Sequence, residues 1–410
     1  MNLRELLAGL PDDPRVVVTG NHATPWSVLA EIDAGLPSYR LWALNGQVGL
    51  PDRDGVVLET SFVGPGQRRS PRLHYVPCRL SLVPRLFERR QPPDLVVLHT
   101  TTPRGGRVSL GTEVNVLPAA VTAARNRGGR VVVQANPQMP WTGGDALLDL
   151  ELVDAVVDTD EPLPVAAPAP ADPTAERIGA LVAGLVPDGS TLQAGIGAVP
   201  DAALRGLRDR RGLRVWTEMF SDSVLALERA GALDDEVPVV ASFLFGSAEL
   251  LEWVDRNDRV VMRRTETTND PALIARHDRM VSVNTALEVD LFGQANASRI
   301  DARIHSGCGG QTDFIVGALH SRGGQALIAL RSWHPRADVS TVVPLLDEPT
   351  TSFQMSAVVT EQGIAEVFGH DQREQARQLI EHAAHPRVRE ELWEEAHALG
   401  LGRGLPRMDS

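Results

Sequence analysis

The sequence contains no lysine, and arginine supplies all 40 of its Lys and Arg residues. A Schiff-base lysine, a lysine nucleophile and the phosphate-binding lysine of a P-loop are therefore excluded. Cysteine is almost as scarce: Cys78 and Cys308 are the only two. Two distant cysteines form neither a disulfide framework nor a four-ligand zinc site, so we expect no metal.

Long apolar runs and excess positive charge are also missing. No stretch approaches the roughly 18 uninterrupted apolar residues that cross a bilayer, and residues 1–13 lack the order of a signal peptide. We therefore expect a cytoplasmic protein with no membrane partner. The formal net charge of −13 has the wrong sign for nonspecific nucleic-acid binding, so no nucleic-acid partner is expected.

The chain has 410 residues, and 43% of them are hydrophobic, which is the composition of a globular protein. Residues 161–174 contain five prolines and are interpreted as a linker. We predict an N-terminal domain over residues 1–160 and a C-terminal domain over residues 175–410.

Both parts alternate apolar β-branched runs with segments of helical spacing. RVVVT at 15–19, DLVVL at 94–98 and RVVV at 130–133 are examples. This order predicts an α/β fold with mostly parallel sheets covered by helices.

An internal repeat indicates that the two domains are related. The matching pairs are Gly20 with Gly195, Pro25 with Pro200, Leu29 with Leu204 and Trp42 with Trp216. The alternative is chance coincidence of glycine and proline in apolar sequence.

The segment LQAGIGAVP at 192–200 predicts a strand that turns into a helix through two glycines. Backbone amides at such a turn favour a phosphate or a developing oxyanion. A nicotinamide fingerprint is an alternative, but Pro200 stands where the third glycine should be. A plain strand-to-helix turn is the other alternative.

Glu218, in TEMFSD, follows an apolar run and is expected at the carboxyl end of a strand. A carboxylate close to backbone donors can attack a thioester carbonyl. The matching repeat position is Leu44, so the carboxylate belongs to one half only. A solvated or salt-bridged glutamate is the alternative.

The segment 280–317 places Glu288 and Asp290 in a strand-like stretch, followed by a glycine-rich turn at Gly307, Gly309 and Gly310. That turn can aim amides at a carbonyl oxygen or make a tight connection. No histidine partner is indicated for Cys308, so it receives no catalytic role. His382 and His385 have HxxH spacing but no third ligand, and we interpret them as solvated helix residues.

Taken in order, LQAGIGAVP, TEMFSD, FLFGSAELLEWV, NTALEVDLFGQANA and SGCGGQTDF resemble the class I CoA-transferase superfamily. The acetyl-CoA hydrolase/transferase branch, which includes 4-hydroxybutyrate CoA-transferases, is the most similar. SFVGPGQRR, VSLGTEVN and NPQMPWTGGD extend the similarity into the N-terminal half, and VVTEQGIAEVFG completes it.

The resemblance implies two related open α/β domains with the active site at their interface. Glu218 matches the family's nucleophile, which becomes covalently linked to CoA. Residues implied to bind CoA or to supply oxyanion donors are Gly195, Ile196, Gly197, Ala198, Val199, Glu288, Gly309 and Gly310.

The implied activity is CoA transfer between a short-chain acyl-CoA and a carboxylic acid by a ping-pong mechanism through a glutamyl-CoA thioester. Acyl-CoA hydrolysis at the same glutamate and a catalytically inert CoA-binding protein are the alternatives. Coenzyme A thioester is expected as a substrate, with no permanently bound cofactor, and relatives imply a homodimer or higher homo-oligomer.

Three segments depart from the family pattern, and one of them, QMSAV at 354–358, lacks a histidine that relatives often carry. Arg104 and Arg107 occupy a loop where relatives carry other residues, so the acyl pocket is expected to differ. Arg331, Trp333 and Arg336 lie near the expected CoA region and either hold phosphates or form ordinary surface.

Overall fold

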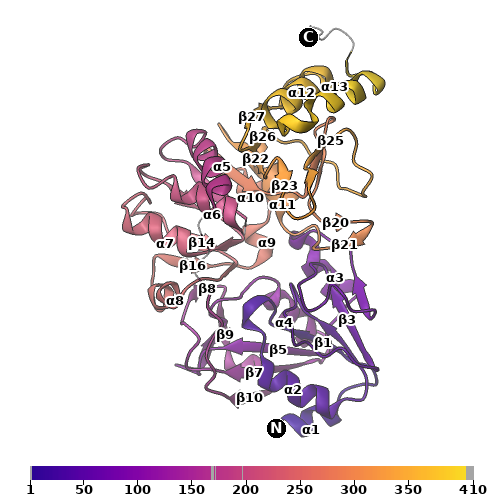
Figure 1. Ribbon diagram of the computed structural model, residues 1–410. Coiled ribbons are helices and arrows are strands. Elements are labelled where there is room, and N and C mark those ends of the chain that lie inside the picture. Colours follow the sequence, from indigo (N-terminus) through magenta and orange to yellow (C-terminus); the bar gives the residue numbers. More distant parts are fainter. Residues whose placement is uncertain (1, 168–169, 171, 196, 403–410) are drawn as a thin grey trace.

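The computed structural model describes residues 2–167, 170, 172–195 and 197–402. It divides into a lower and an upper half in Figure 1, each built on a central sheet, with the C-terminal helices farthest from the N-terminus. The predicted α/β class with mostly parallel sheets is confirmed.

The first sheet has seven strands in the order β10-β7-β5-β1-β2-β3-β4, and all its neighbouring pairs are parallel. Its strands are β1 (Arg15–Val18), β2 (Tyr39–Trp42), β3 (Val56–Thr60), β4 (Leu73–Tyr75), β5 (Leu95–Thr100), β7 (Arg130–Ala135) and β10 (Ala155–Asp158).

The second sheet has six strands in the order β12-β11-β17-β22-β26-β27, parallel except for its last pair. Its strands are β11 (Thr191–Ala194), β12 (Arg214–Val215), β17 (Met280–Asn284), β22 (Gln325–Ala329), β26 (Ala357–Thr360) and β27 (Gly363–Glu366).

Thirteen α-helices lie in the described part of the chain. They are α1 (Leu3–Ala8), α2 (Trp26–Gly35), α3 (Val83–Arg89), α4 (Leu117–Arg125), α5 (Pro173–Gly184), α6 (Ala198–Arg205), α7 (Asp222–Arg229), α8 (Ala248–Val254), α9 (Thr265–Thr268), α10 (Pro271–Ile274), α11 (Gln311–His320), α12 (Gln372–Gln378) and α13 (Arg389–Ala398). No helix in these described ranges has both the length and the apolarity needed to span a bilayer.

Short strands complete the two halves. They are β6 (Arg107–Ser109), β8 (Gly143–Gly144), β9 (Leu147–Asp149), β13 (Met219–Phe220), β14 (Val239–Ala241), β15 (Phe243–Leu244), β16 (Val260–Met262), β18 (Glu288–Asp290), β19 (Ala295–Asn296), β20 (Arg299–Ile300), β21 (Arg303–Ile304), β23 (Trp333–His334), β24 (Val339–Ser340) and β25 (Val342–Val343). β8 pairs with β16, so the halves share a small sheet.

Alternation along the strands explains the two-sided burial of each sheet. In β1, Val16 and Val18 pack in one cluster with Leu29 of α2, whereas Val17 packs in another with Phe87 of α3. Successive side chains of a strand point to opposite faces, so an uninterrupted apolar run needs helices on both sides.

The predicted repeat corresponds to the same β-α-β arrangement in both halves. β1, α2 and β2 form one copy, and β11, α6 and β12 form the other, with parallel pairing in each. In each sheet the first strand lies between the second strand and a later one, β5 or β17. Strand order therefore reverses beside β1 and β11, where α/β proteins hold their ligands.

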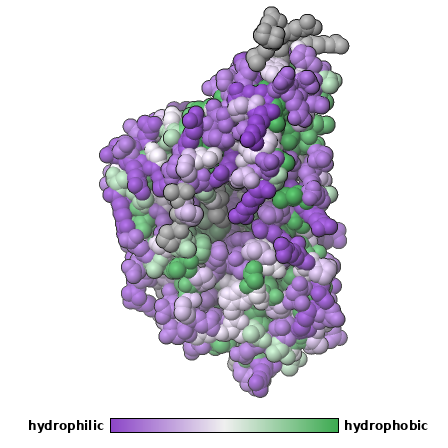
Figure 2. Space-filling model, in the orientation of Figure 1, coloured by the Kyte–Doolittle hydropathy of each residue, from purple (hydrophilic) through white to green (hydrophobic). Residues whose placement is uncertain are grey.

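The described residues between β10 and α5 form neither helix nor strand. We retain residues 1–160, 161–174 and 175–410 as proposed domain and linker boundaries. The surface in Figure 2 is hollowed at the level where the two halves meet.

Candidate active site

Glu218 lies between β12 and β13, just beyond the carboxyl end of β12. Its main-chain oxygen accepts hydrogen bonds from the nitrogens of Ser242 and Phe243, at 2.8 and 3.0 Å. Its side-chain Oε2 accepts a 2.8 Å hydrogen bond from Asn269 Nδ2. Asn269 caps the end of the short helix α9, so one segment holds the main chain of Glu218 and another holds its carboxyl group.

Gly310 lies directly against the Glu218 carboxyl group. A Cβ atom at position 310 would lie 2.0 Å from Glu218 Oε2 and 2.2 Å from Asn269 Nδ2, so no other residue type fits without displacing them. Gly309 has φ of +53°, a left-handed conformation that favours glycine. The glycines of this turn therefore permit a close approach between the backbone and the acid.

The glycine turn is held by the N-terminal half. Val63 N donates to Ser306 O at 2.7 Å, and Leu80 N donates to Gly309 O at 2.9 Å. Phe62 forms an isolated antiparallel bridge with Gly307. The turn thus takes its path from contacts between the two halves of the chain.

A cavity of about 220 Å³ opens beside Glu218. Residues from both halves line it: Phe62, Gln193, Ala194, Gly195, Met219, Asn284, Thr285, Ala297, Ser306, Gly307, Cys308, Gly309, Gly310, Gln311 and Phe314. Glu218, Gly195, Gly309 and Gly310, which were singled out in the sequence, therefore share one cavity.

Gly195 and its repeat partner Gly20 differ in their surroundings. A Cβ at Gly195 would have its nearest neighbour at 3.7 Å, whereas one at Gly20 would lie 2.2 Å from Leu44 O. The second half thus keeps open space at its first strand, and in the first half Leu44 closes the equivalent space.

Gly197, Ala198, Val199 and Glu288 do not line this cavity. Gly197, with φ of +130°, caps the start of α6, and Ala198 and Val199 form its first turn. Ile196 lies outside the described residues. Glu288, on β18, accepts a 2.8 Å hydrogen bond from Asn296 Nδ2 and lines a separate cavity of about 600 Å³.

Burial raises the pKa of Glu218 to about 7. The hydrogen bond from Asn269 lowers this pKa, and the negative charge of Asp313 raises it. Burial likewise raises the pKa of Asp313 to about 6, opposed by contacts with Ser81 and by the charge of Arg79. A nucleophilic carboxylate that ionises near neutral pH suits acyl transfer, because it remains basic when ionised.

Several arginines noted in the sequence have definite contacts. Arg331 forms an ion pair with Asp172, and Arg107 pairs with Asp149 at 2.7 Å. Trp333 packs against His385, with ring centroids 4.9 Å apart. Arg104 lines a cavity of about 470 Å³ between the two halves, apart from the cavity of Glu218.

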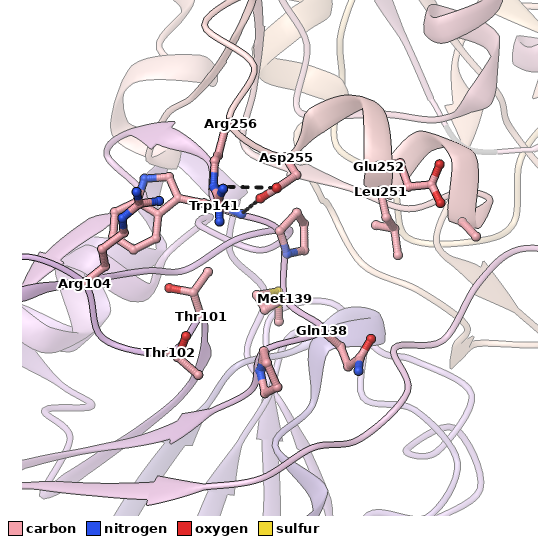
Figure 3. Close-up of a pocket in the computed structure, with 13 residues that line it drawn as sticks. Thr101, Thr102, Arg104, Gln138, Met139, Trp141, Leu251, Glu252, Asp255 and Arg256 are labelled. Carbon is pink, nitrogen blue, oxygen red and sulfur yellow. Dashed lines mark hydrogen bonds and ion pairs between the residues drawn. The ribbon is translucent and has the colours of Figure 1, made fainter.

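Figure 3 shows the cavity that Arg104 lines, with the loops of Thr101 and Trp141 below helix α8. Trp141 N donates to Asp255 Oδ1 at 2.7 Å, and Arg256 N donates to Trp141 O at 2.8 Å. These contacts tie the loop after β7 to the end of α8. The cavity that Arg104 lines is thus a cleft between the two halves.

Asn269, Phe62 and Asp313 belong to the site but were not predicted from the sequence. Each reaches the site through tertiary packing, and a lone residue of these types carries no spacing signal. In the described part of the chain, no group of three or more His, Cys, Asp or Glu residues is arranged for a metal ion.

Comparison with known proteins identifies the chain's relatives. Residues 66–167 match the family model of the acetyl-CoA hydrolase/transferase N-terminal domain, and residues 246–396 match that of the C-terminal domain. Glu218 lies between the two matched ranges.

The chain is 36% identical to the 4-hydroxybutyrate coenzyme A transferase of Clostridium kluyveri, over 82% of this chain and 80% of the relative. RipA from Yersinia pestis has a similar structure, with a TM-score of 0.90 and 27% identity over 97% of each chain. A 4-hydroxybutyrate CoA-transferase from Porphyromonas gingivalis aligns with a TM-score of 0.81 and 31% identity over 96% of each chain. These findings agree with the site geometry, and the chain is an enzyme of the acetyl-CoA hydrolase/transferase family.

Proposed function

We propose that the enzyme transfers CoA between a short-chain acyl-CoA and a carboxylic acid, with Glu218 as nucleophile. The observation that carries this proposal is the Glu218 carboxyl group itself, which lines a cavity between the two halves, against Gly310 and within hydrogen-bond distance of Asn269. A carboxylate in such a cavity can attack a thioester carbonyl.

In the first half-reaction a Glu218 oxygen forms a bond to the acyl carbon, and the carbon–sulfur bond breaks. The CoA thiolate then attacks the Glu218 carbonyl of the mixed anhydride and expels the first carboxylate. A second carboxylate reverses these steps and leaves as its CoA ester. Gly309 and Gly310, just before α11, are our candidates for donors to the oxyanion, where each donor supplies about 10²- to 10³-fold in rate.

We assign CoA binding to Gly195, Ile196, Gly197, Ala198, Val199 and Glu288. Support comes from the open space at Gly195 and from the position of 197–199 at the start of α6, where backbone amides favour anions. Glu288 is expected to orient rather than attack. A homodimer or higher oligomer and a cytoplasmic location complete the proposal.

The decisive experiment traps the thioester. Wild-type enzyme is incubated with acyl-CoA, reduced with borohydride and digested after arginine, and the mass of the peptide of residues 215–229 is measured. We expect modification in the wild type and in Glu288→Gln, and none in Glu218→Gln. An unmodified wild-type peptide under turnover would refute the nucleophile.

Hydrolysis is tested in the same preparation. Free CoA and the CoA ester of the added acid are both measured, with and without acetate or a longer acid, since the thioester can be discharged by water or by an acid. Formation of the new CoA ester when the acid is present supports transfer. Release of free CoA at the same rate with and without the acid, and no new ester, would assign hydrolysis instead.

A further inference from the structure

Three polar side chains are buried side by side near the carboxyl ends of β11 and β17. Gln193, Ser282 and Asn284 are 4%, 0% and 7% exposed, and Gln193 is in register with Ser282. Val281 and Val283, which alternate with the two polar residues of β17, belong to a core cluster on the other face of that strand. The three polar groups therefore share one face, and their burial requires each of them to find hydrogen-bond partners.

Hydrogen bonds among the three side chains fix the orientation of both amides. Gln193 Oε1 accepts from Ser282 Oγ at 2.6 Å and from Asn284 Nδ2 at 3.1 Å. Asn284 Nδ2 also donates to Ser282 Oγ at 2.8 Å, and Gln193 Nε2 donates to Asn284 Oδ1 at 3.3 Å. Such a network holds its members in one arrangement, because each bond orients and polarises the next.

The network leaves one donor of Gln193 available. A primary amide nitrogen carries two hydrogens. Asn284 Nδ2 uses both of its hydrogens, whereas Gln193 Nε2 uses one, on Asn284 Oδ1, among the residues that the structure describes. Gln193 and Asn284 also line the cavity beside Glu218. A nearly buried N–H group therefore borders the space that a substrate would occupy, and an acceptor there would satisfy it.

Another wall of this cavity carries the glycine turn of residues 307–310. Helix α11, which follows the turn, packs on the face of β17 that holds the polar network, where Phe314 and Met280 share a core cluster. Gln311 Nε2 donates to Thr285 O at 3.2 Å and so ties the start of α11 to the end of β17. The amides of the network and the backbone of the turn thus bound the same cavity.

The surroundings of Gln193 indicate which acceptor would take this bond. A Cβ at Gly195, in the space to which we assign CoA, would lie 3.8 Å from Asn284 Oδ1. An acyl-CoA brings two kinds of carbonyl to such a cavity, the thioester carbonyl and the amide carbonyls of the CoA arm. Gly309 and Gly310 are the proposed donors to the thioester oxygen, so the amide oxygen nearest the sulfur is left for Gln193. An amide oxygen is also the better acceptor of the two.

We propose that Gln193 is a substrate-binding residue of the transfer reaction. Its Nε2–H donates a hydrogen bond to the carbonyl oxygen of the CoA amide nearest the sulfur, while Ser282 and Asn284 hold the side chain in place. This inference rests on the proposed function. The bond fixes the sulfur relative to Glu218, so its free energy contributes to kcat as well as to binding.

Paired thioesters test the contact in the full-length enzyme. An acyl-N-acetylcysteamine keeps the amide nearest the sulfur, and an S-pentyl thioester of the same acid replaces it with methylenes. With acetate as acceptor, we expect the wild type to prefer the first in kcat/KM by about tenfold or more, and Gln193→Met to reduce that preference by about fivefold to tenfold. The matched control is Gln134→Met, which alters a buried glutamine that donates to Glu161 Oε2 at 3.4 Å and does not line the cavity. This control should keep the wild-type preference.

An unchanged preference in Gln193→Met would overturn the inference, because a residue with only a structural role lowers the rates of both thioesters equally. Gln193→Asn, which keeps an amide in the network but withdraws it by one methylene, is the second variant and should also lose the preference. Equal use of both thioesters by the wild type would refute the contact without any variant. Failure of the wild type to turn over acyl-CoA itself would instead refute the proposed function, so the two failures are distinguishable.

Discussion

Gly310 and Glu218 are in contact so close that position 310 has no space for a side chain: an added Cβ would lie 2.0 Å from the carboxyl oxygen. A larger residue must push the acid out of place. The identity of residue 310 is thus set by the position of the Glu218 carboxyl group.

Gly310→Ala should lower kcat/KM by about 100-fold, since a displacement of about 1 Å at a reacting group has this effect. Steady-state kinetics and circular dichroism would separate lost activity from lost folding. Gly184→Ala is the control, because a Cβ at position 184, in α5, has no neighbour within 4 Å. Equal activity in the two variants would contradict the contact.

If Glu218 acts as we propose, the wild-type pH profile should report its ionisation. Because the pKa of Glu218 is raised to about 7, its anion is lost as pH falls through this value. We expect kcat/KM to rise with pH and reach half its maximum near pH 7. A midpoint close to the ordinary glutamate pKa of about 4.3 would be inconsistent with this environment.

Asn269→Ala removes the hydrogen bond that lowers the pKa of Glu218. The midpoint of the kcat/KM profile should therefore move to higher pH, and activity at pH 7 should fall by up to about tenfold for every pH unit that the midpoint moves. Asn257→Ala alters an asparagine that bonds Trp253 O at 2.9 Å and should leave the midpoint in place. A midpoint at lower pH in Asn269→Ala would show that Asn269 does not stabilise the anion.

Replacing Glu218 should stabilise the fold at alkaline pH. The folded-state pKa of Glu218 is raised, so the native state binds more protons than the unfolded state between about pH 4.5 and 7, and stability falls across that window. Glu218→Gln abolishes this loss, with an upper limit of about 3 kcal/mol at pH 8 and none below pH 4. Urea unfolding at both pH values measures the difference, and equal stability at pH 8 would argue against a raised pKa of Glu218 in the folded state.

The paired glycines of the repeat should respond differently to alanine. Gly20→Ala places a Cβ 2.2 Å from Leu44 O and should cost about 1–3 kcal/mol of stability through overpacking. Gly195→Ala meets nothing closer than 3.7 Å, so its melting temperature should stay near that of the wild type while KM for acyl-CoA rises. Thermal unfolding and kinetics test both, and a stable Gly20→Ala would contradict the packing of the first half.

Much of the architecture could be predicted because it depends on local pattern. The β-branched runs at 15–19, 94–98 and 130–133 became the parallel strands β1, β5 and β7. Gly195 and Glu218 could be located because each follows the end of a strand.

Other features depend on tertiary contacts. Asn269 contacts Glu218 from the end of a four-residue helix, and Glu113 pairs with Phe243, a neighbour of Glu218 in space. The spacing of residues in the sequence therefore predicts neither contact. Glu288 was placed in the right strand, but the turn after β17 sends it to a different cavity from Glu218. Packing of the whole chain, rather than local spacing, decides these placements.

Hydrogen bonds and a β-bridge from Phe62, Val63 and Leu80 of the first half hold the backbone of residues 306–309 in place. A fragment carrying only residues 175–410 would contain Glu218 yet lose the contacts that hold its neighbouring loop. Both halves thus determine the shape of the site, and a substitution in one half has to remain compatible with the residues that it contacts in the other.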